Sequence, residues 1–234
     1  MSEQQNPRLF DSYDAVTAVF VVLLSALAFE VARNGPAGPI PVHFDLHGQA
    51  NGWGDRNTIA VLIACVAGFT VLANVVVRIT LTRPLAESGL RRTAGLLRGG
   101  AVAMGAVVAL IFASLALSPA MVDPMGRQRL IMACAWLLII GVGAVIGKAA
   151  PNPYMGVRTY WAFHSRLAWD KANRLAGRIY FLGGLIGLLA TPFIDVGHGL
   201  NLNIVLLMLV GGGGATAAIY ESWRVWKNDP ERTV

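Results

Sequence analysis

The sequence predicts an all-α, polytopic membrane protein with six transmembrane helices. Of its 234 residues, 55% are hydrophobic and 14% are charged, and the mean hydropathy is +0.57. Soluble domains usually carry about a quarter charged residues, so this composition belongs in a bilayer. A helix crosses a hydrocarbon core about 30 Å thick with roughly 20 apolar residues. Uncharged runs near this length occupy 15–29, 58–77, 99–117, 130–147, 179–193 and 202–220.

The runs are expected to be helices because none alternates apolar and polar residues as barrel strands do. The first run lacks a small-residue cleavage site before Glu30, and residues 1–14 carry three acidic residues against one Arg. We therefore expect it to remain as a helix rather than to be a cleaved signal peptide. The fifth run is the shortest, and residues 175–178 extend it if Arg178 reaches the interface by snorkelling.

Small residues predict close packing among the last three spans. Gly143 and Gly147 are four residues apart in the fourth span, Gly183 and Gly187 in the fifth, and four glycines occupy 211–214 in the sixth. Such positions let helix backbones approach closely in lipid. A second interpretation of 211–214 is a hinge or broken helix that lines a pore, as in transporters.

Few polar side chains fall inside the spans. Asn74 is the one strongly polar side chain well inside a run, and it favours an interhelical hydrogen bond. Glu30 and Arg178 lie at span ends, where snorkelling explains their charges. Cys65 and Cys134 have neither a disulfide framework nor a metal-ligand spacing, so we interpret them as small apolar core residues. This pattern argues against a charge relay across the membrane.

The distribution of Lys and Arg predicts the orientation. Fifteen of the 19 basic residues fall in the even-numbered loops and at the two ends of the chain, and four fall on the other side. We expect residues 1–234 to form a single membrane domain. By the positive-inside rule, its segments 1–14, 148–178 and 221–234 lie in the cytoplasm and 34–57 lies outside the cell. The net charge of +6 and the pI near 9.8 therefore reflect topology and contact with anionic membrane lipids rather than nucleic-acid binding.

The outer loop at 34–57 is a candidate for chemistry. Its three prolines exclude regular helix, so residues 40–46 are expected to be extended, with His43, Asp45 and His47 on one side. Together with Asp195 and His198 of the last outer loop, they suggest a metal face. The alternative is that His43 is a packed, hydrogen-bonded loop histidine, because H-x-D-x-H is not a recognised catalytic spacing.

The polar loop at 148–178 is the other candidate, and Asn152, Arg158, Trp161 and Trp169 stand out in it. One interpretation is an interfacial helix from about 164 to 174 that Arg, Lys and Trp anchor at the headgroups. A second is a specific binding or signalling surface, since a guanidinium fork grips carboxylates, phosphates or carbonyls. Catalysis is a third, but Ser165 and His164 are adjacent and cannot face each other on a helix.

This loop resembles the C-terminal signature of the SdpI-like family of bacterial membrane proteins, with Asn173 where the family often has His. The residues that carry the resemblance are Asn152, Gly156, Val157, Arg158, Thr159, Trp161, Trp169, Lys171, Asn173, Arg174 and Gly177. A second stretch is similar to the family's N-terminal module. It comprises residues 40–44, Gly48, residues 51–53 and Arg56.

The resemblance implies an immunity or toxin-sensing protein of the bacterial cell membrane, which binds a secreted antimicrobial peptide at the bilayer. In the family's founding case it also captures a cytoplasmic repressor. The resemblance implies no cofactor, catalytic residue or metal ligand. The binding residues that it implies are His43, Gly48, Trp53, Asn152, Gly156, Arg158, Thr159, Trp161, Trp169 and Asn173. Two alternatives remain open, an outward-facing, metal-dependent membrane enzyme and a small-molecule or lipid transporter.

Overall fold

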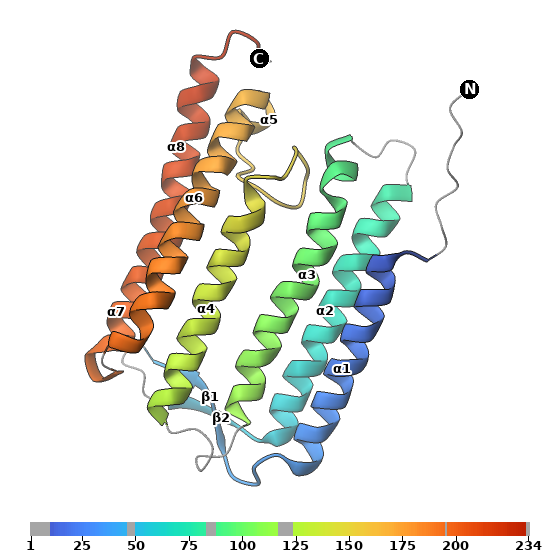
Figure 1. Ribbon diagram of the computed structural model, residues 1–234, viewed down its shortest axis with the longest axis vertical. Helices are drawn as coiled ribbons and strands as arrows, with labels where there is room; N and C mark the ends of the chain where they lie inside the picture. The colour runs from blue at the N-terminus through green and yellow to red at the C-terminus, as the bar shows by residue number, and fades with distance from the viewer. Residues whose placement is uncertain (1–9, 46–49, 83–87, 117–123, 195, 233–234) are drawn as a thin grey trace.

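Long antiparallel helices lie side by side along the whole molecule (Figure 1). The computed structural model describes residues 10–45, 50–82, 88–116, 124–194 and 196–232. In chain order the elements are α1 (Ser12–Asn34), β1 (Ile40–Phe44), β2 (Ala50–Gly54), α2 (Arg56–Thr82), α3 (Ser88–Leu115), α4 (Pro124–Ile146), α5 (Tyr160–Phe163), α6 (Arg166–Ala190), η1 (Thr191–Phe193), α7 (Val196–Met208), η2 (Leu209–Gly213) and α8 (Gly214–Lys227).

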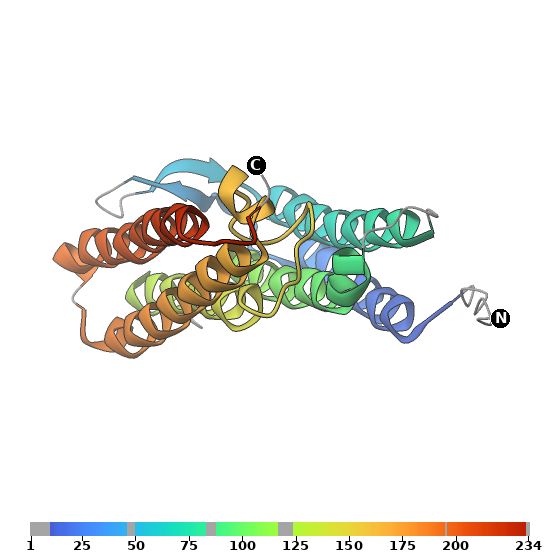
Figure 2. The same ribbon diagram turned by 90° about the horizontal axis from the view of Figure 1, so that it is seen from above.

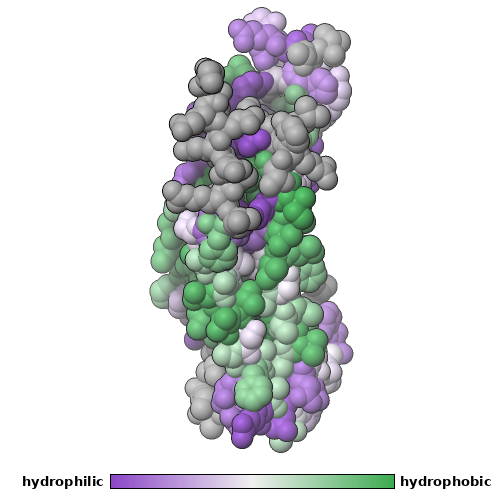
Figure 3. All heavy atoms as spheres, turned by 90° about the vertical axis from the view of Figure 1, so that its right-hand side faces the viewer, coloured by the Kyte–Doolittle hydropathy of each residue, from purple (hydrophilic) through white to green (hydrophobic). Residues whose placement is uncertain are grey.

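Six stretches of helix among the described residues are long and apolar enough to cross a membrane, which confirms the expected fold class. They are Ser12–Asn34, Arg56–Leu81, Thr93–Leu115, Gly126–Ile146, Arg166–Phe193 and Leu202–Lys227. Figure 3 shows hydrophobic side chains across the middle of the molecule and hydrophilic side chains gathered at both ends. This is the distribution that a bilayer requires of a spanning protein.

The start of α1 and the end of α8 lie at the same end of the bundle, which we call the termini end (Figure 1). The loop between α4 and α6 is also there, and the β1–β2 hairpin lies at the opposite end, which we call the hairpin end. An even number of spans produces this arrangement. The assignment of the termini end to the cytoplasm remains a prediction from the charge distribution.

Two spans begin earlier than the uncharged runs indicated. Helix α3 starts at Ser88 rather than near 99, and α6 starts at Arg166 rather than near 179. The interpretation of 164–174 as a separate interfacial helix is therefore wrong, because Ser165 caps one 25-residue helix that runs on to Ala190. A run is cut at its first charge, whereas a helix continues through charged turns whose side chains are exposed, as in α6, or paired inside the bundle, as Arg98 is in α3.

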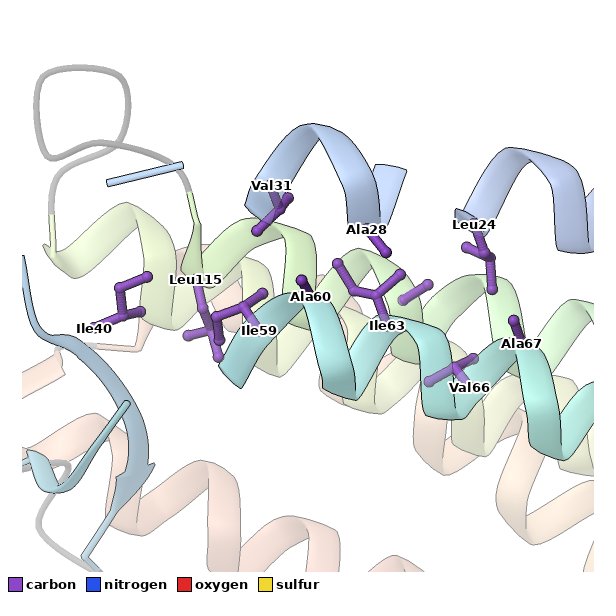
Figure 4. Packing of buried hydrophobic residues seen from close by; sticks show 11 residues of the cluster. Leu24, Ala28, Val31, Ile40, Ile59, Ala60, Ile63, Val66, Ala67 and Leu115 are labelled. Atoms are coloured by element: carbon purple, nitrogen blue, oxygen red, sulfur yellow. The ribbon is translucent and has the colours of Figure 1, made fainter. Parts of the chain in front are cut away.

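Helices α1, α2 and α3 pack around one apolar cluster (Figure 4). Leu24, Ala28 and Val31 of α1 are buried against α2, where Ile59 and Ile63 are fully buried. The expected interhelical role of Asn74 is confirmed, since its Oδ1 accepts a bond of 2.9 Å from Arg98 Nε on α3. Cys65 departs from the expected core position because it lies on an exposed side of α2, whereas Cys134 is buried.

Helices α4 and α6 approach each other through glycines, as the small-residue spacing predicted. A Cβ atom at Gly143 would lie 2.4 Å from the Phe181 backbone nitrogen, and one at Gly147 would lie 3.3 Å from the Arg174 Cα. Farther toward the hairpin end, a Cβ at Gly187 would lie 2.3 Å from the Trp136 ring. The antiparallel pair thus stays in close contact from the termini end to the hairpin end.

The glycines at 211–214 do not interrupt the last span. Residues Leu209–Gly213 form a π-helical turn between α7 and α8, so the stretch stays helical. The Tyr180 hydroxyl lies 3.3 Å from the Gly211 carbonyl oxygen and donates a hydrogen bond to it. Such turns widen the backbone locally, and here the side chain of α6 partners one of its carbonyls.

The expected extended segment after the first span is a strand, and β2 pairs with it. In this antiparallel hairpin Ile40 lies opposite Gly54 and His43 opposite Gly52. A Cβ at Gly52 would lie 2.8 Å from the His43 Cβ, so glycine allows the two strands to pair here. Buried Ile40 joins the core cluster of α1, α2 and α3, which anchors the hairpin to the bundle.

Candidate functional site

The loop between α4 and α6, residues 147–165, is built around a buried side chain and is called the signature loop below. Asn152 is fully buried. Its Oδ1 accepts bonds of 2.8 Å from the backbone N–H groups of Tyr154 and Met155, and its Nδ2 donates to the carbonyls of Ala150 and Met155. All four hydrogen-bonding positions of the amide are thus used to shape the turn.

Trp169 and Asn173 on α6 hold the signature loop against the bundle. The Trp169 indole N–H donates to the Ala149 carbonyl at 2.7 Å. Asn173 Oδ1 accepts from the Val157 N–H at 2.7 Å, and its Nδ2 donates to the Trp169 carbonyl at 2.9 Å. Both side chains are buried inside the protein, so they support the loop and are not exposed on the surface as tryptophan anchors would be.

Gly156 lies against these two side chains with a backbone φ of +126°. A Cβ there would lie 2.8 Å from Asn173 Oδ1 and 2.9 Å from the Trp169 ring. Glycine is therefore required twice, once for the backbone conformation and once for the close approach.

The signature loop also contacts the helices of the N-terminal half. The Tyr154 hydroxyl lies 3.0 Å from Thr80 Oγ1 on α2, and a Cβ at Gly89 of α3 would lie 1.9 Å from the Pro151 carbonyl oxygen. Figure 2 shows the loop between α3 and α6 when the molecule is seen from the termini end. It therefore connects the two halves of the bundle.

Two hydroxyl groups fasten the signature loop to the C-terminal helix and tail. Ser222 Oγ donates to the Ile219 carbonyl, so it accepts the proton of Thr159 Oγ1 at 2.8 Å. Ser165 Oγ donates to the Asp229 carboxylate and accepts from the Ala168 N–H, which caps α6. The Ser165 hydroxyl and the Glu231 backbone N–H hold the pKa of the Asp229 carboxyl below its ordinary value, so the carboxyl is ionised at neutral pH.

A smaller set of side chains is presented outward from the signature loop. Arg158 is exposed, and its guanidinium donates to the Pro153 carbonyl. A carbonyl is one of the three kinds of partner expected for this guanidinium from the sequence. Tyr160 is exposed and stacks on His164, with ring centroids 3.9 Å apart, and its ring edge meets Trp226. Trp161 is half-buried in α5. This surface combines a cation with aromatic rings.

The residues singled out at the hairpin end are separated from the signature loop by the length of the bundle. His43 Nδ1 lies 2.5 Å from Asn51 Oδ1 across the two strands, and the Trp53 side chain is 60% exposed. His47, Gly48 and Asp195 lie outside the described residues, as does the side chain of His198. Within the described part of the chain, no three His, Cys, Asp or Glu side chains are placed to hold a metal ion.

The sequence analysis did not predict a charge cluster at the termini end, where Arg98 directly precedes the third apolar run. Arg98 on α3 is 4% exposed, and it donates to Asp11 Oδ2 at 2.6 Å and to Asp14 Oδ1 at 2.7 Å. Arg78 on α2 pairs with Asp14 as well, and the Arg98 guanidinium lies over the Tyr13 ring. The pattern Asp11-x-x-Asp14 was the available signal, because both carboxylates cap the start of α1.

Comparison with known proteins identifies the segment that carries the signature loop. Residues 148–220 match the SdpI/YfhL protein family. Over these residues the chain is similar to that family. No curated protein and no solved structure gives a significant match to the chain.

The SdpI-like segment comprises the signature loop, α6 and most of the last span. Seven of the ten residues that the resemblance implied lie in this segment. Six of them take part in the contacts described above, namely Asn152, Gly156, Arg158, Thr159, Trp169 and Asn173, and the seventh is half-buried Trp161. His43 and Trp53 lie at the far end of the bundle. Ser165, Ser222 and Asp229 are additional members of the loop's hydrogen-bond network, and a serine before an apolar helix was the signal for Ser165.

Proposed function

We propose that this protein is a membrane immunity or sensing protein that binds a secreted, membrane-active antimicrobial peptide at the bilayer and blocks its action without altering it. The observation that carries the proposal is the match of 148–220 to the SdpI/YfhL family. That segment holds the signature loop, whose outward groups are a guanidinium and aromatic rings. Such groups suit recognition of another molecule.

The chemistry of Ser165 favours binding over catalysis in this loop. Its hydroxyl donates to the Asp229 carboxylate, and its oxygen accepts the Ala168 N–H. A nucleophilic serine instead gives its proton to a neighbouring base such as imidazole. The adjacent His164 directs Nδ1 to the Tyr160 carbonyl at 2.8 Å, so this ring nitrogen is the donor and is used in holding α5.

The contacts of the signature loop connect the membrane spans to the exposed surface around Arg158 and Tyr160. The loop contacts α2 through Thr80 and the C-terminal helix through Ser222. A peptide that changed the packing of the spans would therefore change the surface around Arg158 and Tyr160. We propose that this surface is where a cytoplasmic repressor is captured when the peptide is bound.

Survival of a sensitive bacterium tests the proposal. Cells that express the protein are exposed to a panel of secreted membrane-active peptides beside cells that express an unrelated six-span protein at the same abundance. We expect a higher lethal concentration for at least one peptide, with that peptide recovered intact by mass spectrometry. Cleaved or modified peptide would support an enzyme instead, and equal killing across the panel would remove the immunity proposal.

A further inference from the structure

One face of α6 changes from basic to apolar along its length. Lys171, Arg174 and Arg178 are exposed and follow one another at helical spacing. Phe181, Leu185 and Leu189 continue the same face and are exposed as well. No hydrogen bond or ion pair joins the three cations to another described side chain, whereas Arg166 on this helix pairs with Asp170 at 3.3 Å.

The cations lie at the depth of lipid headgroups if the apolar part of the face lies in hydrocarbon. With a rise of 1.5 Å per residue, Arg174 is about 6 Å and Lys171 about 10 Å beyond Arg178. The headgroup layer on each side of a bilayer is roughly 5–8 Å thick. Arg178 and Arg174 therefore fall within the layer that contains the phosphates.

The start of the signature loop, directly after α4, adds a fourth cation at this depth. Gly147 packs beside Arg174, with 3.7 Å from a Cβ position at Gly147 to the Arg174 Cγ. Lys148 follows Gly147 directly and is exposed, with no side-chain partner among the described residues. The end of α4 and the basic face of α6 thus border one seam, with one cation from the start of the signature loop and the others from α6.

We propose that Lys148, Arg174 and Arg178 bind the phosphate groups of anionic phospholipids at the seam between α4 and α6. Guanidinium groups pair with phosphate oxygens through two parallel hydrogen bonds, and Lys148 adds a point charge. A lipid is a better occupant than a free phosphate because its acyl chains would cover the apolar continuation of the same face. The lipid would stabilise the packing of the SdpI-like segment from outside.

Lipid add-back to purified, delipidated protein tests this site. Each basic group near an anionic surface contributes about 1 kcal/mol, which corresponds to roughly fivefold in affinity. We expect phosphatidylglycerol to bind and to raise the melting temperature, with little effect of phosphatidylcholine or inorganic phosphate. The double variant Arg174→Gln and Arg178→Gln should weaken phosphatidylglycerol binding by roughly thirtyfold.

The matched control is Arg166→Gln with Arg224→Gln, which removes the same charge from residues that already pair with Asp170 and Glu221. An equal loss in both double variants would show general charge attraction and overturn the site. If the first variant fails to fold, cross-linking of wild-type protein to a photoreactive phosphatidylglycerol decides. Labelled peptides should then contain 171–178 or Lys148, and labelling elsewhere, or equal labelling by phosphatidylcholine, would overturn the site.

Discussion

Asn173 Oδ1 accepts a hydrogen bond of 2.7 Å from the backbone N–H of Val157, sixteen residues earlier in the chain. The bond joins the middle of the signature loop to a spanning helix, is part-buried, and lies beside Trp169 and Gly156. An unpaired backbone N–H in such a place costs free energy comparable to a lost hydrogen bond. The position of Arg158, the next residue in the chain, therefore depends on Asn173.

Asn173→Ala should lower the free energy of unfolding by about 1–3 kcal/mol, because the Val157 N–H and the Trp169 carbonyl both lose a partner. The measurement is thermal or denaturant unfolding in one detergent. Asn57→Ala is the control, since Asn57 is exposed at the start of α2 and its loss should change stability by less than about 0.5 kcal/mol. Equal effects of the two variants would show that the loop is not held by Asn173.

Gly156→Ala should destabilise the signature loop by about 1–3 kcal/mol, because the new methyl group meets Asn173 and the Trp169 ring while the backbone stays at a φ of +126°. Limited proteolysis between 150 and 160 reports the loop directly. Gly38→Ala is the control, as no atom lies within 4 Å of its Cβ position. A loop that resisted protease as well as wild type would contradict this account.

Arg98→Gln should destabilise the protein by about 1–3 kcal/mol. The change leaves Arg78 as the remaining cation for Asp14 and removes the partner of Asp11. The expected loss is less than for a fully buried pair because the Asp11 side chain is 42% exposed. Arg91→Gln on the same helix is the control, since Arg91 is exposed. If both variants unfolded at the same denaturant concentration, the cluster would contribute nothing to stability.

Much of the fold was readable from the sequence because a bilayer imposes it. The six spans followed from apolar length, and the contact of α4 with α6 followed from Gly143 and Gly147. The start of α6 did not, because residues 166–178 alternate charged positions with a face of small residues, including Ala168, Ala172 and Ala176, that is buried. The charged residues at 166–178 thus kept this amphipathic part of α6 out of the uncharged run, although it belongs to the same helix.

The sequence singled out residues that meet in the signature loop, and their part in binding stays a prediction. Asn152, Trp169 and Asn173 were selected as binding residues, and the structure shows them as buried supports of the loop. Residues that are far apart in the sequence complete the network, as when Ser165 meets Asp229 and Thr159 meets Ser222. Such contacts require the tail to fold back beside α6, and no local pattern encodes that approach.

The charge distribution predicts that the termini end faces the cytoplasm. In a variant without Cys65 and Cys134, single cysteines replace Ala37 near the hairpin end or Asn228 after α8, both of which are exposed. A membrane-impermeant thiol reagent should label position 37 in intact cells and position 228 after permeabilisation. The reverse pattern would invert the topology and move the signature loop outside the cell.

Arg158→Lys should lose function nearly as far as Arg158→Ala while both variants insert normally. The Arg158 guanidinium donates one group to the Pro153 carbonyl and presents the rest of its planar fork outward. A compact ammonium cannot hold the loop carbonyl and a second acceptor in the same geometry, so the bidentate contact is lost with the charge retained. A simple membrane anchor would behave differently, since Lys snorkels about as well as Arg.

Survival of cells exposed to the peptide is compared at equal membrane abundance of the variants, with Arg224→Lys as the control for an exposed, paired arginine. Full protection by the Lys variant would reduce Arg158 to an anchor and remove it from the proposed recognition surface.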